Sequence, residues 1–430
     1  MKLGSLIKME RLGQEMKQET LAKGICSVSH LSRIENNLTP LSDDFLAQFQ
    51  DRLGVVLKRE YVPLKIDIDR DISVVQELFR NVIDTRDKEA AQGLIKTLLT
   101  MQNTHTYYFT ELSLMEFRLR LMFKTEVKGV FEYVAKMRLI WGELLPIQHF
   151  RILVIEGIAN YMCGEIKSSV GLFSKSFFML DDVLLHESEL ADFYYVAAVA
   201  VVGDNQLYAA IEYSNRAFEY FQREVLGNRM VECMLINGLT YKLSGRYDEA
   251  LAEFQRAEKL CKQLNLNDFL GRIYQNIGGT YSLKNDSENA ISYFKNALIE
   301  KKKPDDLIIT LFSIVKEHTI LDEEFNALKW VQDAFKLLPQ TSDDKRIPFT
   351  HHLLIYKALN ENSVQLEQYC IDALSFFEEK QQYKHCYKYG ILLANAYSEQ
   401  NKRKKAIIYY QKCYQYTLKQ KNLMRWENLA

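Results

Sequence analysis

The stretch RIYQNIGGTYSLKNDSENAISYFKNALIEKKK, residues 272–303, decides the fold of this chain. The pattern begins with a small residue, Gly278, and an aromatic residue, Tyr281, three positions later. Ala290, Phe294 and Ala297 follow at offsets of twelve, sixteen and nineteen from Gly278. The same offsets occur 40 residues earlier, at Gly238, Tyr241, Ala250, Phe254 and Ala257. Two copies of one spacing predict a repeated pair of helices.

This spacing is that of the tetratricopeptide repeat, although 40 residues exceed its usual length of about 34. Alanine allows two antiparallel helices to approach closely, and the aromatic residues fill the groove toward the next pair, so we assign them to packing. Weaker copies follow the same spacing at Tyr161 and Phe173, Ala210 and Ala217, Ala327, Ala334 and Pro339, Leu366 to Phe377, and Tyr397, Ala406, Tyr410 and Cys413. The pattern predicts a right-handed superhelical repeat domain over residues 73–430.

The inner surface of such a superhelix is lined by the first helix of each pair and can hold an extended peptide. In the repeat of residues 272–303, the spacing places Arg272, Gln275 and Asn276 on that inner face. Asn276 is the first candidate for a peptide contact, because an amide donates and accepts hydrogen bonds at once. The same offsets add Phe312, Lys316, Lys388, Asn395 and Asn160, with Asn237 one position out of register. Alternatively, each asparagine caps a helix or is only solvated.

A second informative stretch, residues 18–36, has the pattern of a helix-turn-helix. Leu31 and Ile34 share the buried side of its second helix, so short polar and cationic side chains occupy the other faces. Such a helix can lie in the major groove and reach phosphates or base edges. The candidate DNA contacts are Gln18, Ser27, Val28, Ser29, His30, Ser32 and Arg33. Ser27 also suits a helix cap, and Arg33 has the alternative of pairing with Glu35 or an acid of the first helix.

A further helix is predicted to start with a polar cap in the segment Thr39-Pro40-Leu41-Ser42-Asp43-Asp44. Phe45, Leu46, Phe49 and Leu53 follow at helical spacing. This helix closes an all-helical DNA-binding domain over residues 1–60. Pro63 interrupts the helical periodicity, and residues 61–72 are therefore expected to form a linker. The whole chain is predicted to be all-α.

Composition limits the classes of function. A formal net charge of −1 restricts any DNA binding to the N-terminal domain, and two such domains on a two-part site favour a dimer. No apolar run is long enough for a membrane span, and the first residues lack the pattern of a signal peptide. The seven cysteines are scattered without a CxxC pair, which argues against a disulfide framework and a zinc site. We expect a cytoplasmic protein without a membrane partner.

Enzyme signatures are absent from the sequence. There is no GxxxxGK[ST], HExxH or GxSxG motif. The adjacent residues of His351–His352 and His385–Cys386 diverge by about 100° on a helix, so neither pair is suited to share a metal. We therefore expect no catalytic residue, no metal and no cofactor.

The residues Gly24-Ile25-Cys26-Ser27-x-Ser29-x-Leu31-Ser32-Arg33-Ile34-Glu35 resemble the DNA-binding domain of the RRNPP family, the peptide-pheromone receptors of the NprR and PlcR type. This resemblance covers roughly residues 1–60 and implies an XRE or lambda-repressor-like domain. It also implies a short signalling peptide in the repeat groove, double-stranded DNA as a partner, and a homodimer or higher homo-oligomer. The length of the repeat array is closer to the NprR type. That type implies a second activity on a response regulator of the sporulation phosphorelay.

The sequence thus predicts a quorum-sensing transcription regulator that binds promoter DNA under the control of a peptide. Two alternatives remain open at this point. One is a repeat scaffold that binds a protein partner in its groove. The other is a phosphorelay inhibitor that acts on a response regulator through the helical region of residues 84–125.

Overall fold

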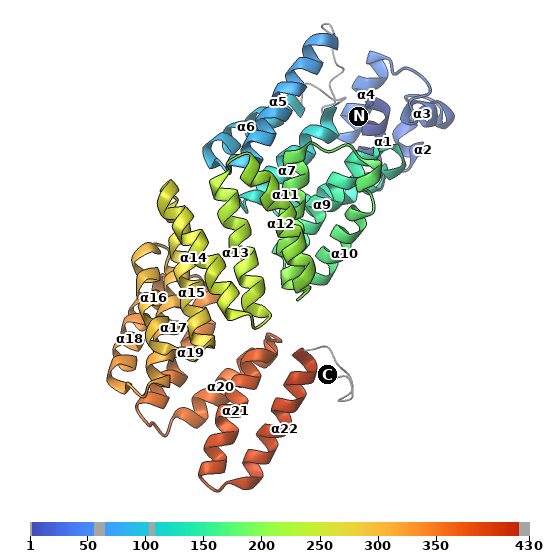
Figure 1. Ribbon diagram of the computed structural model, residues 1–430. Helices are drawn as coiled ribbons and strands as arrows, with labels where there is room; N and C mark the ends of the chain where they lie inside the picture. Colours follow the sequence, from blue (N-terminus) through green and yellow to red (C-terminus); the bar gives the residue numbers. More distant parts are fainter. Residues whose placement is uncertain (1, 56–64, 103–107, 421–430) are drawn as a thin grey trace. The chain divides into compact units, whose positions relative to one another are not determined.

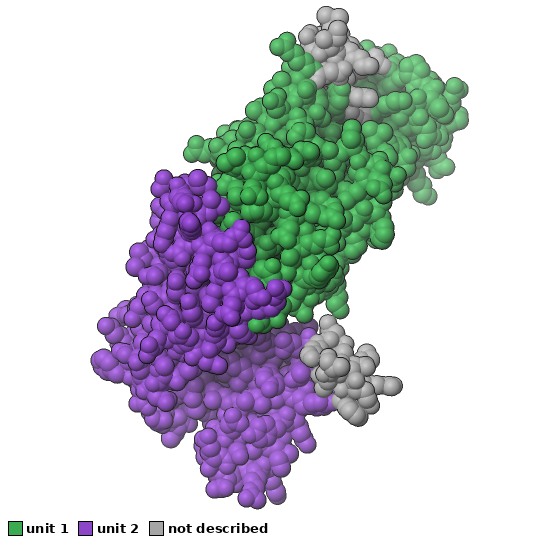
Figure 2. All heavy atoms as spheres, in the orientation of Figure 1, with its two compact units in different colours: residues 1–245 green, residues 246–430 purple. Residues whose placement is uncertain are grey.

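The computed structural model describes residues 2–55, 65–102 and 108–420, and the regular secondary structure in these ranges is entirely helical (Figure 1). The predicted all-α class is confirmed. The chain forms two compact units, Met1–Gly245 and Arg246–Ala430 (Figure 2). In the described ranges, no helix combines the length and the apolar character that crossing a membrane requires.

Unit 1 opens with four short helices, α1 (Leu3–Gly13), α2 (Gln18–Ala22), α3 (Val28–Glu35) and α4 (Asp43–Leu53). The predicted cap at Ser27 is present, and Ser42 supplies the polar cap predicted within residues 39–44. The backbone N–H of His30 donates to Ser27 Oγ, and that of Phe45 donates to Ser42 Oγ, each at 3.2 Å. Their apolar faces form a core that includes Leu21, Ala22, Leu31, Ile34, Phe49 and Leu53. Local capping and periodicity therefore account for the helices of this domain.

The rest of unit 1 is a series of helices: α5 (Lys65–Thr85), α6 (Lys88–Gln102), α7 (Phe109–Met122), α8 (Lys128–Arg138), η2 (Trp141–Glu143), α9 (Pro146–Met162), α10 (Ile166–Phe177), η3 (Leu180–Asp182), α11 (Glu187–Gly203), α12 (Leu207–Arg223) and α13 (Gly227–Leu243). Helix α5 begins at Lys65, inside the stretch expected to be a linker, and residues 61–64 lie outside the described ranges. The helical array therefore starts earlier than residue 73.

The N-terminal domain packs on the helices that follow it in unit 1. Its buried residues share one hydrophobic cluster with Val130, Val134 and Met137 of α8 and with Ile152 and Ile155 of α9. Two ion pairs lie at the edge of this contact. Lys8 Nζ lies 2.7 Å from Glu143 Oε1, and Lys136 Nζ lies 3.3 Å from Glu10 Oε1. In this structure the domain is docked on the body of unit 1.

Unit 2 contains α14 (Tyr247–Leu264), η4 (Asn267–Phe269), α15 (Leu270–Leu283), α16 (Ser287–Glu300), α17 (Pro304–Ile320), α18 (Glu324–Leu337), η5 (Leu338–Gln340), α19 (Asp343–Asn360), α20 (Leu366–Glu379), α21 (Tyr383–Glu399) and α22 (Arg403–Gln420). Its helices form consecutive antiparallel pairs, as the repeat pattern predicts (Figure 1). Within pairs, single left-handed residues such as Asn285 (φ 59°) and Asn401 (φ 57°) turn the chain, a conformation that asparagine tolerates.

The repeat positions pack as their spacing predicts. Gly278 lies so close to the second helix of its pair that a Cβ there would be 2.7 Å from the ring of Phe294. Ala290 and Ala297 are fully buried, and the small residues of the weaker copies, Ala210, Ala217, Ala327, Ala334, Ala406 and Cys413, are buried as well. The small residues at the repeated offsets therefore allow the two helices of a pair to approach closely, and the aromatic residues pack between helices.

Candidate DNA-binding and peptide-binding sites

The candidate recognition helix α3 presents a polar face to solvent. Val28, Ser29 and Arg33 are exposed, and Ser32 is half-buried. Ser27 Oγ lies 3.1 Å from Ser29 Oγ, so the start of the helix carries two neighbouring hydroxyl groups. These groups and one guanidinium suit contacts with phosphates and base edges.

Glu35 holds the helix-turn-helix together from its buried side. Its carboxylate accepts from Arg11 Nε at 2.6 Å and Nη2 at 2.9 Å, and Arg11 Nη1 also donates to the carbonyl of Met16. Gln18 Nε2 donates to the same carboxylate at 2.7 Å. Gln18, a candidate phosphate contact, is therefore engaged within the domain.

The pairing of Arg33 with Glu35, considered from the sequence, does not occur in this structure because Arg11 occupies that carboxylate. Arg33 is exposed, and within the described residues it forms no ion pair. His30 is half-buried and packs edge-on against Phe45, with ring centroids 5.6 Å apart. The arginine is thus open to solvent, whereas the histidine is anchored to α4.

In unit 2, the candidate residues of α15 differ in how far they are engaged. Gln275 Nε2 donates to Ser313 Oγ at 3.2 Å, and its Oε1 accepts from Lys301 Nζ at 2.9 Å and Thr310 Oγ1 at 2.6 Å. Gln275 is therefore part of a bridge between α15 and α17.

Arg272 and Asn276 are the other two candidate residues of α15. Asn276 Nδ2 donates back to the carbonyl of Arg272 at 3.0 Å, one turn earlier on the same helix. Arg272 is exposed, and its guanidinium lies 5.7 Å from the ring centre of Phe269. Arg272 thus has the freedom to meet a ligand.

Further along unit 2, α17, α19 and α21 bring candidate residues together. Phe312 contacts the rings of Phe349, His352 and Tyr356, with centroids between 5.1 and 5.7 Å apart. Lys316 Nζ donates to Ser282 Oγ at 2.8 Å and lies 3.0 Å from the carboxylate of Glu317. This end of the repeat therefore combines aromatic rings with a partly exposed ammonium.

His352 is buried within this aromatic cluster and contacts residues of the next repeat. Its Nδ1 forms a hydrogen bond with the hydroxyl of Tyr389, and its ring lies 4.8 Å from that of His385. Burial, with the charges of His385 and Lys388, lowers the pKa of His352 to about 2, so the ring is neutral. In the described part of the chain, no group of three His, Cys, Asp or Glu side chains is arranged to hold a metal.

The remaining candidates are placed as follows. Asn395 is exposed on α21, and its Oδ1 accepts from the hydroxyl of Tyr410 at 2.7 Å. In unit 1, Asn160 Nδ2 donates to the carbonyl of Glu156 on its own helix. Asn237 is buried and donates to Asn215 Oδ1 at 2.9 Å. These contacts within unit 1 match the alternative reading, in which the asparagines serve the helices themselves.

Sequence reasoning missed a buried ionic network in unit 1. Asp192 is 3% exposed and is paired with Arg118, with Arg86 at 3.1 Å and with Arg229 at 3.0 Å. Burial alone would raise the pKa of Asp192, but the three guanidinium groups lower it to about 2. Arg229 also lies 2.6 Å from Glu232. The members of the network come from three helices, α7, α11 and α13, and from the turn between α5 and α6. No spacing along the chain signals them.

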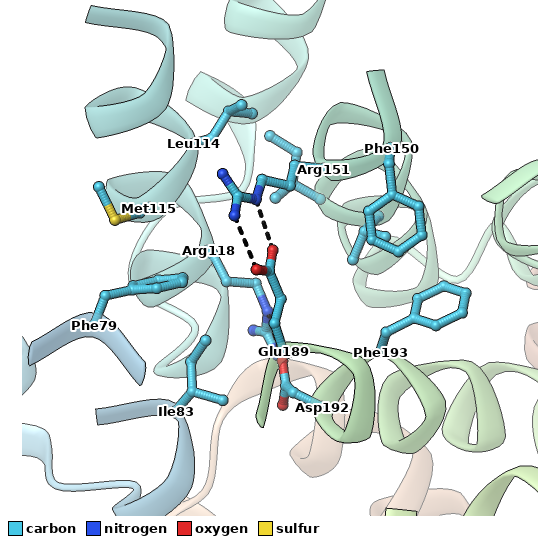
Figure 3. Close-up of a pocket in the computed structure, with 12 residues that line it drawn as sticks. Phe79, Ile83, Leu114, Met115, Arg118, Phe150, Arg151, Glu189, Asp192 and Phe193 are labelled. Carbon is cyan, nitrogen blue, oxygen red and sulfur yellow. Dashed lines mark hydrogen bonds and ion pairs between the residues drawn. The ribbon is translucent and has the colours of Figure 1, made fainter. Parts of the chain in front are cut away.

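A small cavity of about 30 Å³ adjoins this network (Figure 3). Its walls are mostly apolar and include Phe79, Met115 and Phe150. On one side, Arg151 binds the carboxylate of Glu189 through Nε and Nη2, at 2.6 and 2.9 Å. A space of this size holds about one water molecule, so we assign it to packing and to no ligand.

Comparison with known proteins agrees with this architecture. Residues 230–298 and 391–419 match models of the tetratricopeptide repeat. The chain is 25% identical over 410 residues to the transcriptional activator NprA of Geobacillus stearothermophilus, which covers 92% of this chain and 98% of NprA. The chain is homologous to NprA, which agrees with the resemblance to the RRNPP family.

The chain is also similar to a second curated protein and to two solved structures. It is 22% identical to response regulator aspartate phosphatase I of Bacillus subtilis (strain 168), over 81% of this chain and 89% of that protein. Its fold is also similar to that of the quorum sensor NprR from B. thuringiensis in the apo form, with a TM-score of 0.67 over 81% of this chain and 99% of that one, at 17% identity. For NprR in complex with its cognate peptide NprX, the TM-score is 0.59 over 80% and 97%, also at 17% identity.

Proposed function

We propose that this protein is a cytoplasmic quorum-sensing transcription regulator that binds promoter DNA through residues 1–60 under the control of a short signalling peptide. The observation that carries this proposal is the exposed polar face of α3, with Ser29 and Arg33 open to solvent, on a helix-turn-helix fixed from behind by Glu35. The same chain carries a repeat array with the fold of peptide-binding relatives. In this proposal, one chain combines a DNA-binding domain with a repeat domain that binds the peptide.

The peptide controls DNA binding only through its differential affinity for the two arrangements of the DNA-binding domains. This linkage is reciprocal, so a peptide that tightens DNA binding tenfold is itself bound tenfold more tightly by the DNA complex. The proposed peptide contacts are Arg272, Asn276, Phe312, Lys316 and Asn395, which are at least partly accessible in unit 2. Gln275, Asn160 and Asn237 are engaged within the fold and are the weaker candidates.

A homodimer or higher homo-oligomer is part of the proposal. One α3 helix reads only half of a two-part site, and two helices spaced by about 34 Å would occupy successive turns of the major groove. Sedimentation of the protein with and without a DNA duplex measures this directly. A strictly monomeric complex on DNA would contradict it.

The variant Arg33→Ala tests the DNA-binding role. We expect it to weaken binding to a promoter fragment from upstream of the protein's own gene by about 10- to 100-fold, because one base or phosphate contact is lost. Fluorescence anisotropy at a fixed salt concentration measures the affinity. Arg256→Ala is the matched control, since Arg256 is exposed in unit 2 and pairs only with its helical neighbour Glu253. Equal affinities for the wild type and Arg33→Ala would refute this use of α3.

A second candidate function is action on a response regulator of a phosphorelay, favoured by the similarity to the aspartate phosphatase over 89% of that protein. The region expected to act, residues 84–125, includes Asp84, whose carboxylate accepts from Ser188 Oγ at 2.7 Å and from the hydroxyl of Tyr220 at 3.0 Å. The rate of phosphate loss from a phosphorylated response regulator, with and without this protein, tests the activity. An unchanged rate would leave DNA binding as the function.

A further inference from the structure

The side chain of Lys388 lies among aromatic rings of three helices in unit 2. Its Nζ is 4.8 Å from the ring centre of Tyr356 on α19 and 5.3 Å from the ring centres of Phe312 on α17 and Tyr389 on α21. Such contacts attract the charged ammonium through the ring quadrupoles. They position its charge without using its three N–H donors.

Those donors have no acceptor in the described part of the chain, where Lys388 forms neither a hydrogen bond nor an ion pair with a carboxylate. The charges that act on it, Lys316 and Lys384, have the same sign. The side chain is half-buried, so water reaches it only in part. An ammonium held in this way lacks part of its hydration and has gained no counter-ion in exchange.

The carboxylate of Glu317, which pairs with Lys316, is already satisfied. Glu317 is fully buried, and it accepts from Ser282 Oγ and from Ser287 Oγ at 2.8 Å, with Lys316 3.0 Å away. His352 and His385, which also face the cluster, have pKa values lowered by burial and contribute no negative charge. Lys316 is therefore paired with Glu317, whereas Lys388 has no carboxylate partner in the described residues and keeps its positive charge.

We propose that Lys388 is the recognition site for a carboxylate group of the signalling peptide. This inference rests on the proposed function, because the ligand is the peptide itself. Lys388 and Asn395 are seven residues apart on α21, about 10 Å along the helix, which equals about three residues of an extended peptide. Within the described residues, the amide nitrogen of Asn395 has no partner, so it can donate to the peptide backbone. The aromatic rings would pack against the carbon atoms next to the acidic group.

A random heptapeptide library with free carboxyl termini provides the probe. The full-length protein and Lys388→Met are each incubated with the library, and bound peptides are sequenced. We expect the wild type to select peptides with an acidic group at one fixed position. Lys388→Met should lose that selection and bind the selected peptides about 10- to 100-fold more weakly, as expected for one charged hydrogen bond.

Controls separate a loss of charge from a loss of structure. Lys412→Met removes another lysine that lies over a ring, 5.2 Å from Tyr409 on the last helix, and should leave peptide binding unchanged. Lys388→Arg retains the charge and should retain part of the affinity. Circular dichroism confirms that each variant is folded. Selected peptides are remade with asparagine for aspartate or with an amidated carboxyl terminus, which tells a side-chain carboxylate from the terminal one.

The outcomes distinguish the two levels of the proposal. Peptides selected without an acidic group, and bound equally by Lys388→Met, would overturn the role of Lys388 and leave peptide sensing intact. If the folded wild type selects no peptide at all, the proposed function fails and this inference fails with it. Loss of binding in both Lys388→Met and Lys412→Met would also overturn the specific role of Lys388.

Discussion

Two sites of buried charge, one in each unit, have opposite characters. In unit 1, the guanidinium groups of Arg86, Arg118 and Arg229 surround the carboxylate of Asp192, and Glu232 adds a further negative charge. In unit 2, the ammonium of Lys388 lies against aromatic rings and has no carboxylate partner in the described chain. Each charged group of the first site has an ion-pair partner, whereas the ammonium of the second site has none in the described residues.

The difference agrees with a structural role for the first site and with the proposed ligand-binding role of the second. A buried charge that is fully paired stabilises the arrangement of the helices that supply its partners, because removing one partner leaves the others uncompensated. A partly buried charge without a partner costs stability, and proteins commonly keep such groups where a function requires them. The comparison therefore predicts stability changes of opposite sign.

The largest effect is expected for Asp192→Asn. Three guanidinium groups lose their shared carboxylate in a buried site, so unit 1 should lose about 3–5 kcal/mol of unfolding free energy. Urea unfolding at neutral pH, followed by circular dichroism, measures the change. Asp248→Asn is the matched control, because Asp248 is 84% exposed and its ion pair with Lys284 contributes little. A urea midpoint of Asp192→Asn equal to that of the wild type would show that the network does not stabilise the fold.

Acid should weaken the same site. The pKa of Asp192 is lowered to about 2 in the folded protein from an ordinary value of 3.8, so its stabilising contribution is fully present above about pH 4. It is lost as the pH falls from about 4 to 2, and a shift of this size corresponds to about 2 kcal/mol. The difference in stability between the wild type and Asp192→Asn should therefore shrink over this range. A constant difference would show that the charge of Asp192 is not responsible.

The smallest effect, and the opposite sign, is expected for Lys388→Met. Burial lowers the pKa of Lys388 to about 8 from 10.5, which means that the folded state disfavours the ammonium. The variant should be more stable near pH 7, by on the order of 1 kcal/mol after allowance for partial exposure. This gain should fade as the pH rises from about 8 to above 10, where the amine is neutral in both states. If Lys388→Met were less stable than the wild type at neutral pH, Lys388 would instead have a structural role in the fold.

Much of the fold follows from patterns that are local in the chain. A cap at Ser27 and a polar cap within residues 39–44 are predicted because a short polar side chain before an amphipathic stretch accepts from an unpaired backbone N–H of the first helical turn. The repeat was predicted because Gly278 and Ala290 occupy positions where only a small residue allows close helix approach. The exposure of Arg33 also followed from helical periodicity. These features depend on residues that are near one another in the sequence and therefore near one another in a helix or a helix pair.

The candidate sites could be predicted only in part. Spacing placed Lys316, Lys388 and Phe312 on inner faces, and the structure brings them together. Spacing did not show that Gln275 accepts hydrogen bonds from Lys301 and Thr310. These bonds depend on how two repeats stack.

The sequence by itself therefore determined the helices, their caps, the repeat and the solvent-facing residues of α3. Tertiary structure alone decided that Asp192 pairs with Arg86, 106 residues away, and that Glu35 pairs with Arg11. It also decided that Lys388 lies over the ring of Phe312 and has no carboxylate partner in the described residues. The physical reason is that helix formation depends on neighbours within about one turn. The partners of a buried charge depend instead on the packing of several helices, which no single stretch of sequence specifies.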